Sequence, residues 1–152
     1  MIEKIAITQG KHLESLIIKR NFLEKTSKIT DKSIGTLSKN CPNLKHLTID
    51  YSRKFEMDLA INLSLNLRNL EVLLLPNCPV IVDMSPLVTA CPILAEVSLA
   101  GDSWVRKICL MGLSQHPNIK ILHLGHFEHS DVECKDLLPP ADELVENYCE
   151  TA

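Results

Sequence analysis

Apolar residues recur along this chain in triplets, with an apolar residue at relative positions 1, 4 and 6 of each copy. The first residues of the last four triplets lie 26, 24 and 25 residues apart, and a longer gap of 31 residues separates the first two triplets. Positions 4 and 6 alternate as in a buried strand, and no single copy can bury its apolar face alone. The pattern predicts five parallel strands stacked over one core, built from the triplets Leu13/Leu16/Ile18, Leu44/Leu47/Ile49, Leu70/Leu73/Leu75, Leu94/Val97/Leu99 and Ile119/Leu122/Leu124.

Helices are expected between these strands. Residues 58–66 alternate as a strand would when read alone. Their register within the repeat favours a helix, because Leu63 then occupies the place that Leu37 has one repeat earlier. Asp31 is the expected N-cap of the earlier helix, and Pro86 suits the first position of a later one. The expected helices are residues 2–9, 32–40, 58–66, one that starts at Asp83 or at Ser85-Pro86 and runs to about residue 90, and 104–115. The expected strands are 13–19, 44–49, 70–75, 94–99 and 119–124.

The chain is expected to form one repeat domain over residues 1–125, followed by a C-terminal element over residues 126–152. The first helix is interpreted either as an N-terminal cap or as part of a half-repeat that packed against a segment now missing. The C-terminal element holds 8 acidic residues and one basic residue. Its apolar residues share one helical face, which predicts a cap helix, with a disordered acidic tail as the alternative. These apolar residues are Leu144, Val145, Tyr148 and Cys149.

A fixed period in the twenties with the spacing L-x-x-L-x-L is the signature of leucine-rich repeats, so the expected fold class is an α/β solenoid. Two stretches carry a closer resemblance. They are Ile29-Thr30-Asp31 leading to Cys41-Pro42-x-Leu44, and Cys78-Pro79-Val80-Ile81-Val82-Asp83 leading to Cys91-Pro92-x-Leu94. Both resemble the cysteine-containing class of leucine-rich repeat, which is typical of F-box/leucine-rich-repeat proteins. The resemblance covers roughly residues 13–125.

This resemblance implies a horseshoe arc with about five parallel strands on the concave side and helices on the convex side. It also implies protein–protein recognition through the concave face, in the role of a substrate-recruiting subunit of a cullin-type ubiquitin ligase. No F-box segment, which docks the ligase adaptor, is visible before residue 13. The chain is therefore expected to be a fragment, a truncated paralogue or a stand-alone repeat protein, and an F-box further upstream would add the adaptor to its partners. The alternative function is a stand-alone scaffold or inhibitor that resembles the ribonuclease-inhibitor group in fold only.

The residues that flank the buried leucine of each strand are expected to point out of the concave face. An apolar patch rimmed by polar residues suits a protein-binding surface. The competing interpretation is that small solenoids tolerate aliphatic residues at such positions. A further row beside them holds Lys19, Asp50, Pro76, Ala100 and Gly125. The expected partner-binding residues are Ile17, His46, Thr48, Val72, Leu74, Glu96, Ser98, Ile121 and His123.

Charge and cysteine content indicate the cellular compartment and the classes of partner to expect. Residues 1–54 hold 11 basic and 5 acidic residues, whereas residues 55–152 hold 5 basic and 14 acidic ones, so the chain is electrically polar along its length. The six cysteines form no C-x-x-C pair, which favours buried reduced thiols and a cytoplasmic or nuclear protein. No run of about 18 apolar residues and no recognisable nucleic-acid module is visible, so neither a membrane nor a nucleic acid is an expected partner.

Histidines offer the chain's main candidates for metal or catalytic chemistry. His123, His126 and His129 lie at intervals of three with Cys134 nearby, which is a possible zinc pattern. Strand and turn positions send these side chains in different directions, so exposed turn histidines are the preferred interpretation. His116 is expected at a helix end, where a positive charge is favourable. No local signature frames a catalytic residue, so the chain is not expected to be an enzyme, and no metal or cofactor is expected.

Overall fold

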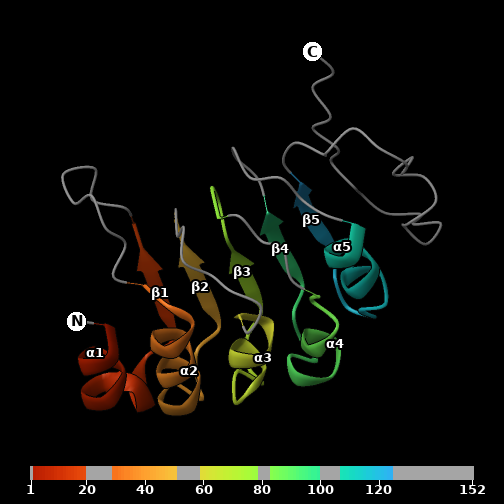
Figure 1. Cartoon of the computed structure of the whole chain (residues 1–152). Coiled ribbons are helices and arrows are strands. Elements are labelled where there is room, and N and C mark those ends of the chain that lie inside the picture. Colours follow the sequence, from red (N-terminus) through yellow and green to blue (C-terminus); the bar gives the residue numbers. More distant parts are fainter. Residues whose placement is uncertain (1, 20–28, 51–58, 79–82, 100–106, 125–152) are drawn as a thin grey trace.

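The computed structural model describes residues 2–19, 29–50, 59–78, 83–99 and 107–124, and the structural statements below concern these residues. They form an α/β fold in which five parallel strands make one sheet in the order β1-β2-β3-β4-β5. The helices stand beside the sheet in the same order as the strands (Figure 1). The strands are β1 (Ser15–Ile18), β2 (His46–Ile49), β3 (Val72–Leu74), β4 (Glu96–Leu99) and β5 (Ile121–Leu124). The helices are α1 (Ile2–Gln9), α2 (Asp31–Asn40), α3 (Leu59–Ser64), α4 (Pro86–Ala90) and α5 (Lys107–Ser114), and a 3-10 turn, η1 (Gly10–His12), follows α1.

The predicted strands are confirmed, but each begins two residues later than expected. The first residue of a triplet closes a turn before the strand starts. The backbone N–H of Leu44, for example, donates to the carbonyl oxygen of Cys41 at 3.2 Å, and that of Leu94 donates to Cys91 at 3.0 Å. The first triplet position therefore buries its side chain from a turn, and the parallel ladder starts two residues further along.

The helical interpretation of residues 58–66 is correct, because α3 covers Leu59–Ser64 and Leu63 is fully buried. The predicted N-cap of α2 is wrong by one residue. Thr30 is the N-cap, and its hydroxyl accepts a hydrogen bond from the Ser33 N–H at 3.4 Å. The Ser33 hydroxyl in turn accepts from the Thr30 N–H at 2.9 Å, which completes a capping box. Asp31 lies in the first turn, where its negative charge is still favourable.

The triplets build the core that the pattern predicted. All nine side chains of the second, third and fourth triplets are fully buried. In the first triplet Leu13, Leu16 and Ile18 are only partly buried, because β1 is the edge strand of the sheet. Helix residues such as Ile34 and Leu87 complete the same cluster. Contacts run between successive helices and between successive strands, as expected when each repeat packs on its neighbours.

One hydrogen-bond arrangement recurs at the start of β2, β3, β4 and β5. The N–H groups of Lys45 and His46 both donate to the carbonyl oxygen of Glu14, at 2.8 and 3.1 Å. The same two-to-one arrangement joins β3 to the Lys45 carbonyl, β4 to the Glu71 carbonyl and β5 to the Ala95 carbonyl. Because four successive repeats share this bonding, their strands hold one common register.

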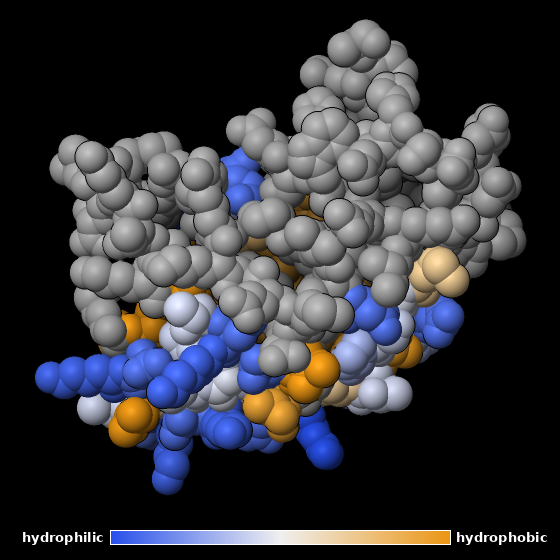
Figure 2. All heavy atoms as spheres, in the orientation of Figure 1, coloured by the Kyte–Doolittle hydropathy of each residue, from blue (hydrophilic) through white to orange (hydrophobic). Residues whose placement is uncertain are grey.

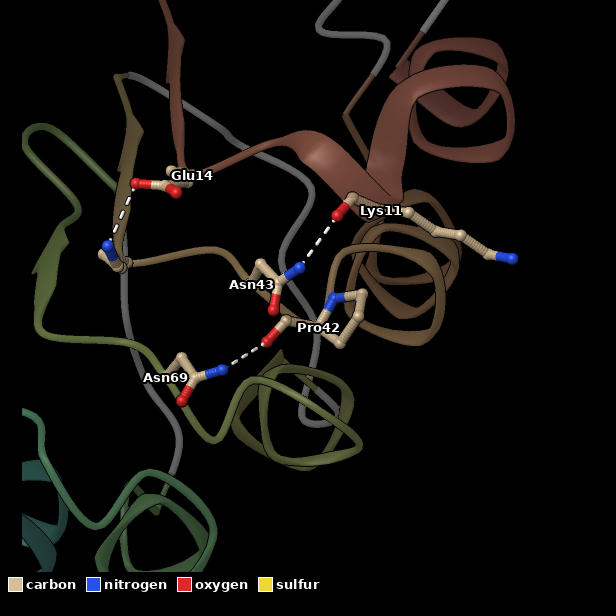
Figure 3. Close-up of polar contacts among 6 residues, drawn as sticks. Lys11, Glu14, Pro42, Asn43 and Asn69 are labelled. Atoms are coloured by element: carbon tan, nitrogen blue, oxygen red, sulfur yellow. Dashed lines mark hydrogen bonds and ion pairs between the residues drawn. The ribbon is translucent and has the colours of Figure 1, made fainter.

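Asparagine side chains brace neighbouring repeats at the turns before the strands, which the sequence pattern did not suggest. The Asn43 amide donates to the Lys11 carbonyl at 2.8 Å, and the Asn69 amide donates to the Pro42 carbonyl at 2.9 Å (Figure 3). Asn118 makes the equivalent bond to Pro92 at 2.6 Å. Each asparagine stands one residue before its triplet and bonds to the repeat before it, so we call this set the asparagine ladder.

Candidate protein-binding face

The parallel register gathers the predicted binding residues into rows on the sheet face opposite the helices, which we call the open face. Side chains alternate along a strand, so the neighbours of the buried central leucines point to this face. The first row is Ser15, His46, Val72, Glu96 and Ile121, and the second is Ile17, Thr48, Leu74, Ser98 and His123. A third row starts with Lys19 and Asp50, because the Asp50 N–H donates to the Ile18 carbonyl at 2.8 Å and extends the ladder by one residue.

Apolar side chains cross the open face without belonging to the core. Ile17 on β1 is 60% exposed and Ile121 on β5 is 43% exposed. Val72 and Leu74 on the central strand are half-buried. The predicted apolar residues thus lie on one face and are accessible at both ends of the sheet. Ser98 is the buried member of the two rows, at 9% exposure, so it offers little surface to a partner.

The polar groups of the open face include two carboxylates. The Glu96 carboxylate lies 3.8 Å from the Nε2 of His123, and both side chains are partly exposed. The Asp50 carboxylate accepts a hydrogen bond from the Asn77 amide at 3.1 Å. Asn77 follows β3 in a left-handed conformation with a φ of 57°, which asparagine tolerates better than most residues. This turn therefore holds Asp50 at the end of the face nearest the strand C-termini.

Basic side chains lie at the borders of the open face. Among its described residues on β2 to β5, and at Asp50 and Pro76, no lysine or arginine is present. Lys45 precedes β2 and pairs with Glu14 at 3.0 Å, and this exposed, hydrogen-bonded ion pair raises the pKa of Lys45. Lys120 precedes β5. The described interior of the face thus combines apolar groups with two carboxylates and two histidines.

The predicted histidine cluster lies mostly outside the described residues, since His126, His129 and Cys134 are not among them. Within the described part of the chain, no group of three or more histidine, cysteine or acidic side chains could hold a metal ion.

His116 lies just after the end of α5, as predicted, but its side chain is buried and not exposed. It is 7% exposed, and its Nε2 lies 2.9 Å from the Cys91 carbonyl oxygen. The Asn118 N–H donates to its Nδ1 at 3.2 Å, so the ring proton lies on Nε2 and donates to Cys91. His116 thus fills the place that Cys41 and Cys91 occupy in other repeats and links its own repeat to the preceding one.

Among the side chains that the structure describes, Cys41, Cys78 and Cys91 are buried free thiols, as predicted. The Cys78 thiol donates to the Ile49 carbonyl oxygen at 3.2 Å and so joins two repeats. Burial raises the pKa of the Cys91 thiol to about 12, and it also raises the pKa of Cys41. A thiol that stays protonated is a poor nucleophile, so burial makes Cys41 and Cys91 poorly suited to nucleophilic chemistry.

On the side that carries the helices, hydrophobic side chains form separate patches among hydrophilic ones (Figure 2). The exposed apolar residues there come from different helices, for example Ile7 of α1, Ile61 of α3 and Met111 of α5. On the open face, in contrast, the strand register aligns the side chains in rows. The open face is therefore a better candidate for protein recognition than the helical side.

Comparison with protein-family models and with curated proteins found no match to this chain. None of the helices in the described ranges has the length and apolar character needed to span a lipid bilayer.

Proposed function

We propose that this chain is a leucine-rich-repeat arc that binds a partner protein through the open face, which would be its concave side. The observation that carries the proposal is the alignment of non-core side chains in rows across five strands. Apolar groups such as Ile17 and Ile121 remain exposed there, although the core is already complete beneath them. Accessible apolar groups rimmed by polar ones are what a protein interface requires.

Within this function, we propose substrate recruitment for a cullin-type ubiquitin ligase in the cytoplasm or nucleus. The support is the resemblance of the Cys41-Pro42 and Cys91-Pro92 repeats to those of F-box proteins, together with the buried reduced thiols at those positions. The alternative is a scaffold or inhibitor without a ligase role. The rows of the open face favour recognition of a partner protein in the ligase role and in the scaffold role alike. The identity of the proteins that bind the chain therefore distinguishes the two roles.

Affinity purification of the chain from its own cells, followed by mass spectrometry, tests both parts of the proposal. Ligase adaptor subunits among the partners are expected for the recruitment role, and one strong partner without ligase components would favour the scaffold. Leu74→Glu and Ile121→Glu place a charge on the open face, so both should remove the recognised partners. An adaptor bound elsewhere should remain.

Met111→Glu is the matched control, because it adds the same charge at an exposed apolar position of α5. Thermal unfolding of all three variants checks that each is folded. Ile121 is more exposed than Leu74, so Ile121→Glu keeps the test decisive if Leu74→Glu fails to fold. Unchanged partners with a folded Ile121→Glu variant would contradict recognition through the open face.

A further inference from the structure

The two carboxylates of the open face and one apolar residue lie along a single diagonal. Asp50 is one strand away from Leu74 and two residues further along the register. Glu96 is one strand away on the other side and two residues back. Leu74 therefore stands midway between the two acidic residues, on the central strand of the sheet.

General strand geometry gives this diagonal its length. Adjacent strands lie about 4.8 Å apart, and residues rise about 3.3 Å along a strand. The Cα atoms of Asp50 and Glu96 are then separated by about 16 Å, with Leu74 about 8 Å from each. A ligand that uses all three positions needs two polar groups at this separation and an apolar group between them.

The charges on the open face indicate which charge the two polar groups of the ligand should carry. Glu96 and Asp50 are carboxylates, and the described strands β2 to β5 carry no lysine or arginine, while Lys19 stands beside Asp50 at the β1 edge of the third row. Cationic groups of a partner would therefore be matched locally by these two carboxylates.

We propose that the open face binds an extended partner segment in which one apolar residue is flanked, two residues away on each side, by lysine or arginine. The inference rests on the proposed recognition function of this face. In an extended segment such residues point to one side, and the two basic residues lie about 13 Å apart. The long side chains of lysine and arginine cover the remaining distance to Asp50 and Glu96.

Selection of random peptides displayed on phage against the purified chain tests this proposal. The expected winners carry the basic-x-apolar-x-basic pattern. A synthetic probe, acetylated Gly-Arg-Ser-Leu-Ser-Arg-Gly, should bind more tightly than the matched peptides with glutamate for arginine or serine for leucine. Its affinity, measured by fluorescence anisotropy, should fall as NaCl rises from about 0.05 M to about 0.3 M, because partly exposed charges are screened.

Isosteric neutral variants locate the contacts. Glu96→Gln and Asp50→Asn should each weaken binding of the probe about twofold to fivefold, as expected for partly exposed ion pairs. Glu3→Gln is the control, because it removes the same charge from an exposed position of α1, away from the open face. Equal affinities for the Glu96→Gln, Asp50→Asn and Glu3→Gln variants would overturn the proposed charge match.

The remaining outcomes separate this inference from the proposed function. Selected peptides that lack basic residues, but lose binding on Ile121→Glu, would overturn the segment chemistry and leave recognition through the open face intact. Selected peptides that bind all open-face variants equally would overturn both. A library that yields no binder would overturn the proposal that a short extended segment suffices, while partner capture would still decide the broader function.

Discussion

The asparagine ladder makes a quantitative prediction about stability. Asn69→Ala removes one amide-to-carbonyl bond, from Asn69 to Pro42, whose atoms lie 2.9 Å apart. A hydrogen bond of this kind contributes about 0.5–1.5 kcal/mol. The Asn69 side chain is exposed, so water can replace it at the Pro42 carbonyl, and no buried acceptor is left unsatisfied. We therefore expect a loss of about 0.5–1 kcal/mol in the free energy of unfolding.

The fourth repeat offers the reciprocal change. Ile93 stands where the other repeats carry Asn43, Asn69 and Asn118, and its side chain is 46% exposed. By the spacing of the ladder, an asparagine at this position would donate to the carbonyl of Arg68. Asparagine also suits the turn in which Ile93 lies. Ile93→Asn should thus raise the free energy of unfolding by up to about 1 kcal/mol.

Urea denaturation monitored by circular dichroism measures both changes, and thermal unfolding provides an independent check. For a domain of this size, about 1 kcal/mol corresponds to a shift of roughly 2–4 °C in Tm. Asn69→Ala and Ile93→Asn should move the denaturation midpoint in opposite directions with an unchanged slope. A destabilising Ile93→Asn, or an Asn69→Ala variant as stable as the wild type, would refute the ladder as a source of stability.

Two further predictions concern the buried positions. Cys91, whose pKa is raised by burial to about 12, should resist iodoacetamide at about pH 8 in the native protein and react once urea unfolds it, as followed by peptide mass spectrometry. Because the Cys91 thiol ionises more readily in the unfolded chain, its contribution to the free energy of unfolding should be complete below the ordinary pKa of 9.0 and should decline as the pH rises above it. Rapid alkylation of Cys91 in the native protein would contradict its burial. Gly112→Ala should destabilise the protein by about 1–3 kcal/mol in urea denaturation, since the added Cβ would lie 2.4 Å from the backbone nitrogen of Ser85. Gln115→Ala, at an exposed position nearby, serves as its control. Equal stabilities of the Gly112→Ala and Gln115→Ala variants would show that α5 can move away from the backbone at Ser85 at little cost in free energy.

The repeat pattern determined the strands and their core because burial at the triplet positions has a simple physical cause. Leu47 and Leu73 must meet the neighbouring repeat, so their spacing appears directly in the sequence. Register within the repeat also identified α3, although local alternation over residues 58–66 suggested a strand. Periodicity was reliable here since it reports contacts that every repeat shares.

Contacts made by single polar atoms were harder to predict. The N-cap of α2 is Thr30 and not the predicted Asp31, because the hydroxyls of Thr30 and Ser33 each accept a hydrogen bond from the other residue's N–H. Asn43 and Asn69 share a position before their triplets, which was a usable signal. Their acceptors, however, are backbone carbonyls in another repeat, and only the three-dimensional register places these within reach.

The open face follows a different rule from the core, and this difference supports its use in recognition. Core positions such as Leu73 repeat the same chemistry in each strand because stacking requires it. The neighbouring open-face positions pair in the same register, yet they change from His46 to Val72 to Glu96 across three adjacent strands. Since stacking imposes no such sequence of side chains, the surface they form is free to match a particular partner, and substitutions there should alter binding before they alter the fold.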